Sequence, residues 1–419
     1  MRILWLKTEL LHPVDKGGKI RTYEMLKCLK QKNHVTYISL DDRMGSADAD
    51  LLATEYCDEL ITVHHSSAPK YSRAFYRQVA ANVLSPLPYA IEKYRSARMK
   101  QVLVERLASG SYDVFVSDFL APSVNVPEQQ DCPSVLFQHN VEAVIWRRHY
   151  EVADGLLKKL YMFMQWLKMR NFEKRECGRY DVVVAVSADD RDILREQYGV
   201  RQAADVPTGV DTEYFSNSGR IARRPNSLVF TGSMDWLPNE DAVIFFVTQV
   251  LPRIRENVED VAFTIVGRNP SERVRELSIK DSCVRVTGPV SDVRPFLEEA
   301  MAFVVPVRIG GGTRLKIFEA MAMGIPVVST TIGVEGLPIR NGTDLLVSDT
   351  PEAFAASVTR LLADEEYAAQ LASRGVATVK SRFSWESAAE AFSSACRLAV
   401  ASQLKGGVQP ASASPKGLP

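Results

Sequence analysis

The sequence predicts an α/β protein with two domains, each built on a doubly wound parallel sheet. Short apolar runs alternate with helical patterns along most of the chain, which is typical of parallel strands joined by crossover helices. A turn-rich stretch at 212–226 interrupts this alternation once. The length of 419 residues also fits two domains of ordinary size. We therefore expect an N-terminal domain at 1–212 and a second domain at 226–384.

Five apolar runs in the first domain read as strands. The loop after the first of them carries Gly17 and Gly18 and leads into a helix, which gives a βαβ unit. Long helical patterns fill the stretches at 70–108 and 142–176. The strands are expected at 3–6, 35–40, 114–116, 135–137 and 182–186.

The second domain shows the same pattern more regularly. A final helix is expected at 385–401. The tail at 402–419 is rich in Gly, Pro and Ser without periodic apolar positions, so we expect it to be disordered. The strands of this domain are expected at 228–230, 261–266, 284–286, 302–306, 327–329 and 345–347.

Composition excludes several classes of protein. Lys and Arg (51) equal Asp and Glu (51), so the chain lacks the basic domain typical of a nucleic-acid binder. The six cysteines form no CxxC pair, and the histidines do not stand at zinc-ligand spacing beside them, so we expect no metal. Lys7 and Glu9 break the first apolar run, which argues against a signal peptide, and no run is long enough to span a bilayer. We expect a cytoplasmic protein.

A glycine-rich segment at 306–324 carries the strongest chemical signal. Gly310, Gly311 and Gly312 directly follow a predicted buried strand and open onto a helix that Thr313 can cap. Free N–H groups at a helix N-terminus form an anion site suited to a diphosphate. The alternative is a glycine-rich turn that binds nothing.

Two cations stand at the start of the same predicted helix. Arg314 and Lys316 flank Leu315, and cations at this end are unfavourable to the helix itself. An anionic ligand would compensate them, whereas the alternative is two solvated basic residues. Glu319 lies about one and a half turns further along and can accept hydrogen bonds from a ribose diol.

The segment resembles the donor-nucleotide motif of the GT-B retaining glycosyltransferases of family 4, also called glycosyl transferases group 1. In that family the loop and helix carry Glu-x7-Glu; Glu319 matches the second glutamate, which holds the ribose, and Gly311 replaces the first. Stretches at 206–215 (VPTGVDTEYF) and 383–386 (FSWE) are similar to family motifs in family order. The resemblance implies two tandem Rossmann-like domains facing a central cleft.

A second departure from the family concerns the leaving group. Most relatives carry an Arg and a Lys after the first strand of the second domain; here Ser233 stands at the Arg position, and Pro238 or Asn239 near the Lys position. A departing nucleoside diphosphate needs positive charge beside its oxygens. We expect Arg314 and Lys316 to supply it and to act as catalytic residues, and we expect Ser233 and Leu315 to be among the residues that bind the donor.

Further site residues follow from the resemblance. Gly17 and Gly18 resemble the family's glycine-rich loop, although a plain helix-entry turn is the alternative. His139, which follows the predicted strand at 135–137, matches a histidine that touches the donor sugar, and we expect it to be catalytic; a structural histidine is the alternative. Val290 matches the loop that holds the nucleobase through main-chain groups, and Arg268 is either close to the phosphates or a solvated loop residue. Asp118 matches no fixed family residue and is left out of the catalytic set.

The resemblance implies an activity. The expected enzyme is a metal-independent retaining hexosyltransferase that moves a sugar from a nucleotide-diphosphate sugar to a hydroxyl of a glycan or lipid-linked acceptor, in cell-surface or exopolysaccharide synthesis. It would use no cofactor besides its donor substrate. Two other classes remain open. A nucleotide-sugar 2-epimerase can share the same architecture, and a non-catalytic sugar-binding scaffold is possible because two usual residues are replaced.

One stretch of the first domain combines apolar and basic residues. Residues 64–180 hold 17 Lys and Arg against 11 Asp and Glu, and 156–170 reads LLKKLYMFMQWLKMR. Such a helix can lie on an anionic leaflet, at the inner face of the cytoplasmic membrane, where a lipid-linked acceptor would be presented. A core helix with snorkelling lysines is the alternative, and it is slightly favoured.

Overall fold

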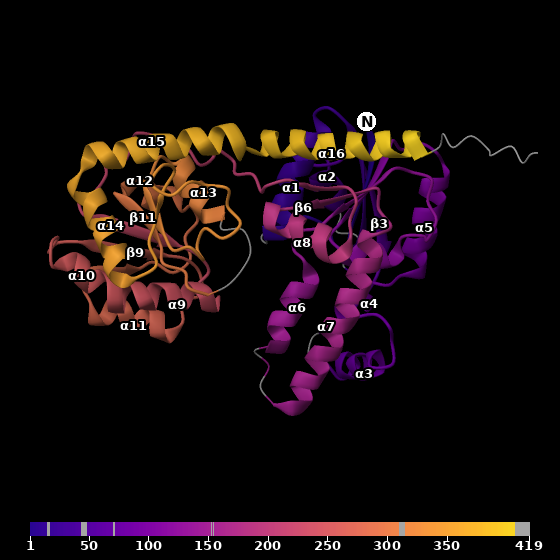
Figure 1. Ribbon diagram of the computed structural model, residues 1–419, viewed down its shortest axis with the longest axis horizontal. Helices are drawn as coiled ribbons and strands as arrows, with labels where there is room; N and C mark the ends of the chain where they lie inside the picture. The colour runs from indigo at the N-terminus through magenta and orange to yellow at the C-terminus, as the bar shows by residue number, and fades with distance from the viewer. Residues whose placement is uncertain are drawn as a thin grey trace, which may run out of the picture. The chain divides into compact units, whose positions relative to one another are not determined.

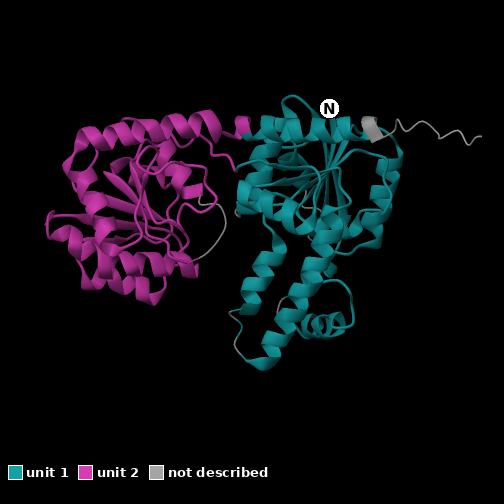
Figure 2. Ribbon diagram, viewed as in Figure 1, with its two compact units in different colours: residues 1–207, 388–419 teal, residues 208–387 magenta. Residues whose placement is uncertain are grey.

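The computed structural model describes residues 1–14, 17–42, 48–69, 72–151, 153, 155–309 and 315–406, with side chains as far as residue 403. The chain forms two compact units (Figure 2), one of residues 1–207 with 388–419 and one of residues 208–387. Each unit is a parallel sheet with helices packed against it (Figure 1). The predicted fold class, two parallel-sheet α/β domains, is therefore confirmed.

Seven strands form the sheet of the first unit, in the order β3-β2-β1-β4-β5-β6-β7. All neighbours are parallel, and the central strand β1 has β2 on one side and β4 on the other. The winding direction therefore reverses at β1 and β4, and parallel sheets bind ligands outside the carboxyl ends of strands at such a point. The strands are β1 (Arg2–Lys7), β2 (His34–Asp41), β3 (Glu59–His64), β4 (Val114–Asp118), β5 (Ser134–Phe137), β6 (Val182–Ala185) and β7 (Ala203–Asp205).

The central strands form because β-branched and aromatic residues are buried on both faces of the sheet. Ile3 of β1 pairs with Val35 of β2 and with Val114 of β4, and all three side chains are fully buried. The sequence does not predict the two edge strands. β3 is only partly buried, and β7 is the three residues Ala-Ala-Asp, whose types do not favour strands. Pairing with β2 and β6 gives these segments their extended form.

The long helical patterns of the first unit are broken where the sequence carries Pro or Gly. The stretch at 70–108 divides into three helices: Pro86 and Pro88 separate the first two, and the Ser96 side chain caps the start of the third. The stretch at 142–176 divides into two around Gly155, which has a left-handed φ of +84°. The helices are α1 (Gly17–Lys30), α2 (Ala49–Ala53), α3 (Arg73–Asn82), α4 (Tyr89–Glu92), α5 (Ala97–Ala108), η1 (Ala121–Asn125), α6 (Glu142–Glu151), α7 (Leu156–Cys177) and α8 (Ala188–Tyr198).

A buried carboxylate fixes the segment that follows β5. Glu173 of α7 accepts hydrogen bonds from two backbone amides at the start of α6, at 2.8 and 2.9 Å, and from the Tyr198 hydroxyl at 2.8 Å. Gln138 Nε2 donates to the same carboxylate at 3.1 Å. An acceptor at a helix N-terminus satisfies amides that lack partners within the helix. The peptide on either side of His139 is therefore held against α7.

Six parallel strands form the sheet of the second unit, in the order β10-β9-β8-β11-β12-β13. Each strand overlaps one of the six predicted runs, and the ends differ by no more than one residue. They are β8 (Ser227–Thr231), β9 (Ala262–Val266), β10 (Val284–Val286), β11 (Ala302–Val305), β12 (Val327–Ser329) and β13 (Leu346–Val347). The helices are α9 (Leu237–Phe245), η2 (Phe246–Val250), α10 (Leu251–Arg255), α11 (Glu272–Lys280), α12 (Arg294–Glu299), α13 (Leu315–Ala322), α14 (Pro351–Ala363) and α15 (Glu365–Arg382).

The last helix, α16 (Trp385–Gly406), starts in the second unit and continues in the first. Its Phe392 packs against Trp5 of β1 and Phe137 of β5, with ring centroids 5.2 and 5.0 Å apart. The helix ends beyond the predicted residue 401, so the tail predicted at 402–419 begins too early; Gln403, Leu404 and Lys405 favour helix. Residues 407–419 lie outside the described part. No described helix of either unit is long and apolar enough to cross a membrane.

Candidate functional site

The five residues 310–314 lie outside the described residues. They include the predicted donor-binding residues Gly310, Gly311, Gly312 and Thr313 and the predicted catalytic residue Arg314. The described chain resumes at Leu315, the first residue of α13.

The remaining predicted residues of the second unit gather at one edge of its sheet. Parallel strands end at the same edge, and the loops after β8, β9, β10 and β11 carry the predicted residues. Val290 packs on the apolar core of the unit from the loop after β10. The residues that follow the four strands in turn are Ser233, Arg268, Val290 and Leu315.

Lys316 reaches the carboxyl end of β8. Its Nζ donates to Asn239 Oδ1 at 2.9 Å and lies 4.1 Å from the ring centroid of Phe230. A Cβ added at Gly232 would lie 2.8 Å from the same Nζ. The ammonium group therefore occupies the place beside Asn239, which is the position near which family members carry their lysine.

Ser233 and Arg268 are brought into direct contact. Arg268 Nε donates to Ser233 Oγ at 3.0 Å, and the Met234 amide donates to the Arg268 carbonyl at 2.9 Å. The turns after β8 and β9 approach so closely that a Cβ at Gly267 would lie 1.7 Å from the Gly232 carbonyl oxygen. Only glycine fits there. Ser233 also donates to Asp235, and this bond lowers the pKa of that carboxyl.

Glu319 lies one turn of α13 beyond Lys316. Burial raises the pKa of the Glu319 carboxyl to about 7, and the nearby charge of Lys316 acts in the opposite direction. The carboxyl group therefore changes its charge close to neutral pH. In its ionised form it only accepts hydrogen bonds, which suits a diol with two O–H donors.

In the first unit, six buried side chains form one polar cluster at the carboxyl ends of β1, β4 and β5. Its centre is Asp118. Oδ2 accepts hydrogen bonds from Trp5 Nε1 (3.1 Å), Lys7 Nζ (2.9 Å) and Thr22 Oγ1 (2.6 Å). We call this group the Asp118 cluster; its members are Trp5, Lys7, Arg21, Thr22, Asp118 and His139.

Ionic charge is stabilised within the Asp118 cluster. Burial by itself would raise the pKa of Asp118, but the charge of Lys7 and the hydrogen bonds to the carboxylate hold it well below the usual range. Burial lowers the pKa of Lys7, and Asp118 opposes this effect. No sequence motif marked Asp118 or Lys7 as a site residue. Their position could have indicated a role in the site, because Lys7 and Asp118 are each the last residue of a strand, at the ligand-binding edge of a parallel sheet.

His139 uses both of its ring nitrogens inside the Asp118 cluster. Arg21 NH1 donates to Nδ1 at 3.1 Å, and because a guanidinium only donates, Nδ1 is the acceptor nitrogen. Nε2 therefore carries the proton and donates to Asp118 Oδ1 at 2.7 Å. Burial lowers the pKa of His139 to about 3, so the ring is neutral. A contact with a donor sugar, as the resemblance implies, would require one of these bonds to open.

The helix entry at Gly17 and Gly18 is shaped by Phe119. A Cβ at Gly18 would lie 2.8 Å from the Phe119 ring, so a larger residue does not fit, whereas Gly17 has open space. Phe119 stacks on His139 with ring centroids 3.7 Å apart and has a left-handed φ of +74°. Such a backbone in a bulky residue costs energy and is often found at functional sites.

Arg21 brings a buried positive charge to the same place. Burial lowers the pKa of its guanidinium to about 10, so it stays protonated at neutral pH. Within the described part of the chain its Nε has no hydrogen-bond partner. A buried donor without a partner is costly, and an anionic ligand at this point would satisfy it.

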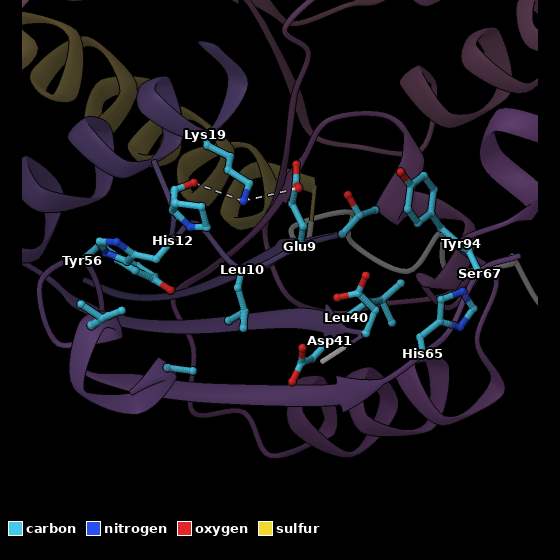
Figure 3. A pocket seen from close by; sticks show the side chains of 15 residues that line it. Glu9, Leu10, His12, Lys19, Leu40, Asp41, Tyr56, His65, Ser67 and Tyr94 are labelled. Carbon is cyan, nitrogen blue, oxygen red and sulfur yellow. Dashed lines mark hydrogen bonds and ion pairs between the residues drawn. The ribbon is translucent and has the colours of Figure 1, made fainter. Parts of the chain in front are cut away.

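A pocket of about 540 Å³ opens beside this edge of the first unit (Figure 3). Residues from the loops after β1, β2 and β3 line it. Lys19 Nζ lies 3.7 Å from Glu9 and donates to the Pro13 carbonyl at 3.4 Å. Carboxylates next to tyrosine rings are suited to hydroxyl-rich ligands. The side chains of this kind are Glu9, Asp41, Asp42, Tyr56 and Tyr94.

Neither a metal centre nor a disulfide is built from the residues that the structure describes. No group of three or more His, Cys, Asp or Glu side chains there could hold a metal ion. None of the six cysteines, all of which lie in the described ranges, forms a disulfide. The expectation of a metal-independent reaction stays a prediction.

Comparison with known proteins gives matches along most of the chain. Residues 16–214 match Glycosyltransferase Family 4, and residues 225–364 match Glycosyl transferases group 1. A Klebsiella pneumoniae protein described as an uncharacterized 44.6 kDa protein in the cps region is 22% identical over 372 residues, which are 85% of this chain and 90% of that one.

Solved structures share the fold. Sucrose-phosphate synthase from Thermosynechococcus elongatus has a TM-score of 0.63 at 16% identity and covers 97% of this chain and 99% of its own. Anabaena HepE in complex with UDP-glucose has a TM-score of 0.58 at 14% identity, over 97% and 100% of the two chains. With its two parallel-sheet units and these two family matches, the chain belongs to the GT-B glycosyltransferases of family 4, group 1.

Proposed function

We propose that the protein transfers a hexose-type sugar from a nucleotide-diphosphate sugar to a hydroxyl of a glycan or lipid-linked acceptor, with retention of configuration. The observation that carries this proposal is the position of Lys316, whose Nζ lies beside Asn239 at the carboxyl end of β8. A cation at this edge can stabilise the negative charge that develops on a diphosphate leaving group, although the usual Arg and Lys of the family are replaced. The cps-region description of the Klebsiella relative supports a role in polysaccharide synthesis.

The reaction breaks the bond between the anomeric carbon and the diphosphate oxygen. The leaving nucleoside diphosphate takes the electron pair, and the acceptor oxygen forms the new bond to the same carbon from the same face. The acceptor proton passes to an oxygen of the leaving phosphate. Lys316 and Arg314 stabilise the negative charge that develops there, so that no metal is needed. The amides of 310–313 hold the diphosphate, and Val290 lies against the base.

The Asp118 cluster contributes to donor binding in this proposal. Asp118 fixes His139 in one tautomer, and His139 in turn positions Arg21. Arg21 Nε is then available to an anionic group that enters beside Gly17 and Gly18. The 540 Å³ pocket beside the cluster takes the acceptor saccharide, whose hydroxyls suit Glu9 and its neighbouring acids. The enzyme works in the cytoplasm, at the inner face of the membrane.

A donor panel tests the proposal. We expect a single class among UDP-, GDP- and ADP-sugars to raise the melting temperature and to be hydrolysed slowly when no acceptor is present. An epimerase would instead release nucleotide and an epimerised sugar. If no nucleotide sugar binds and none is hydrolysed, the protein is a scaffold and the proposed function is wrong.

Donor affinity is expected to depend on pH through Glu319. Its pKa is raised to about 7, so the carboxyl becomes ionised, and a better acceptor for the ribose diol, as pH rises through neutrality. With UDP-glucose as the probe, calorimetry between about pH 6 and about pH 8 should show affinity rising with pH. Glu319→Gln should weaken binding about tenfold and flatten the profile.

Glu335→Gln is the matched control, because Glu335 is an exposed acid of the same unit. It should keep the profile of the unmodified protein. An affinity that is constant across this range in the unmodified protein, or a steep profile in Glu319→Gln, would show that Glu319 does not hold the ribose. If UDP-glucose is not the donor, the same titration is made with the sugar nucleotide that the panel identifies.

A further inference from the structure

The first turns of α7 expose an apolar surface. Leu156 and Leu157 are each 84% exposed, and Leu160 is 62% exposed. The second half of the same helix is different, since Met169, Phe172 and other residues there are buried in the first unit. The core-helix alternative of the sequence analysis therefore applies to the second half of α7, and the first half needs another explanation. Single exposed leucines are ordinary, but three neighbours at one helix end mark an interaction site.

The exposed leucines share one side of the helix. At about 100° per residue, Leu156, Leu157 and Leu160 fall within an arc of about 100°, and Lys158 and Lys159 lie on either side of that arc. Both lysines are exposed. A helix of this kind places its apolar side chains below a lipid headgroup layer, and its lysines at the level of the headgroups.

α6 and α3 pack against the middle of α7, next to its exposed first turns. Tyr150 of α6 stacks on Trp166 of α7, with ring centroids 6.0 Å apart and planes 7° apart. Lys168 Nζ donates to the carbonyl of Asn82 at 2.7 Å, at the end of α3. The exposed leucines therefore belong to a packed arm of α3, α6 and α7, which Figure 1 shows extending away from the sheet of the first unit.

Charge on this arm favours an anionic partner. Residues 72–84 and 142–170 together contain eight Lys and Arg against three Asp and Glu, in a chain whose net charge is zero. Another leucine of the arm, Leu84, lies just beyond the end of α3, and its side chain is 92% exposed. Anionic leaflets attract basic segments close to their surface, and leucines alone would bind a neutral surface equally well. The combination points to an anionic bilayer rather than to an apolar protein groove.

We propose that the arm of α3, α6 and α7 is a membrane-docking surface, which inserts Leu156, Leu157 and Leu160 into an anionic leaflet while Lys158 and Lys159 bind the headgroups. This deepens the proposed function by assigning the surface at which a lipid-linked acceptor would be met. Vesicle binding needs no sugar transfer, so the docking surface and the proposed activity can fail independently.

Vesicle flotation with the full chain tests the docking surface. At low salt the protein should float with phosphatidylglycerol-containing vesicles and stay behind with pure phosphatidylcholine; high salt should release it. The triple variant Leu156→Ser, Leu157→Ser, Leu160→Ser should bind at least about tenfold more weakly. Lys158→Glu with Lys159→Glu should weaken binding at least about tenfold as well.

Matched variants elsewhere on the surface should bind like the unmodified protein. For the leucines the control is Leu51→Ser with Ile279→Ser, which are 70% and 81% exposed. For the charges it is Arg98→Glu with Lys100→Glu on α5, both exposed. Circular dichroism melting checks that every variant is folded, and hydrolysis of UDP-glucose, or of the donor that the panel identifies, should be unchanged in the leucine variant.

Three results would overturn the docking surface. The first is no flotation of the unmodified protein at low salt. The second is equal flotation of the leucine variant and its control. The third is a dimer in light scattering that the leucine variant dissociates while vesicles are ignored, because the leucines would then contact a second copy of the chain.

Discussion

Lys316→Ala is expected to lower kcat by about 100- to 1000-fold, while the protein stays folded and still binds its donor. This is the usual cost of removing one group that stabilises charge developing in a transition state. The Lys316 ammonium lies at the carboxyl end of β8, next to Asn239. Substrate and leaving group both carry the diphosphate, but negative charge grows on it only as the bond breaks, so kcat should fall more than KM rises.

Steady-state kinetics with the identified donor measures this effect. Lys316→Arg should recover part of the activity, because it keeps the charge but not its position. Lys280→Ala is the matched control, since Lys280 is a 72% exposed lysine of the same unit that pairs with Glu276. A Lys316→Ala enzyme with the rate of the unmodified protein would exclude Lys316 from catalysis and leave Arg314→Ala as the variant to examine.

Asp118→Ala is expected to lower the free energy of unfolding by about 3 to 5 kcal/mol. Asp118 is fully buried, and the substitution would remove the carboxylate that pairs with the Lys7 ammonium, leaving that charge in the interior with the neutral Thr22 hydroxyl as an acceptor. Breaking a buried pair from one side is costly, because the remaining charge keeps its desolvation penalty. His139 would also lose the bond that fixes its tautomer. Denaturant unfolding of the full chain measures the loss.

A double variant separates charge from shape at this position. Asp118→Asn with Lys7→Met removes both charges, and it should recover much of the stability that Asp118→Asn alone loses. Asp113→Ala is the control from the position before the same strand, because its carboxylate accepts an exposed hydrogen bond, from the Arg2 amide at 2.7 Å. It should cost less than about 1 kcal/mol. An Asp118→Ala protein as stable as this control would mean that the Asp118 cluster does not hold the first unit together.

The two departures from the family motifs have different outcomes in the structure. Asn239 replaces a cation, and the geometry brings the Lys316 ammonium to within 2.9 Å of it. Ser233 also replaces a cation, and it lies 3.0 Å from the guanidinium nitrogen of Arg268. Each polar residue that replaces a cation is therefore hydrogen-bonded to a basic residue from another segment: Asn239 to Lys316 of α13, and Ser233 to Arg268 after β9. The position of Gly311, where the family has its first glutamate, lies outside the described residues.

The central strands of both sheets could be predicted from the sequence, because fully buried strands are continuous apolar runs. β6 and β11 are examples. The edge strands β3 and β7 could not, since a short or half-exposed segment is extended only when a neighbour pairs with it. The same limit applies to α7, whose apolar and basic residues read as one helix while only its second half is covered.

The sequence by itself determined the fold class, the family and the edge of each sheet at which polar residues gather, because these follow from local runs and motifs. Only the tertiary structure decided which of those residues meet. Lys7, Asp118 and His139 end or follow three strands that are far apart along the chain, and they come together because β1, β4 and β5 are neighbours in the sheet. Spacing along a chain carries no record of strand order. The Asp118 cluster, in which both ring nitrogens of His139 form hydrogen bonds, therefore could be identified only from the folded sheet.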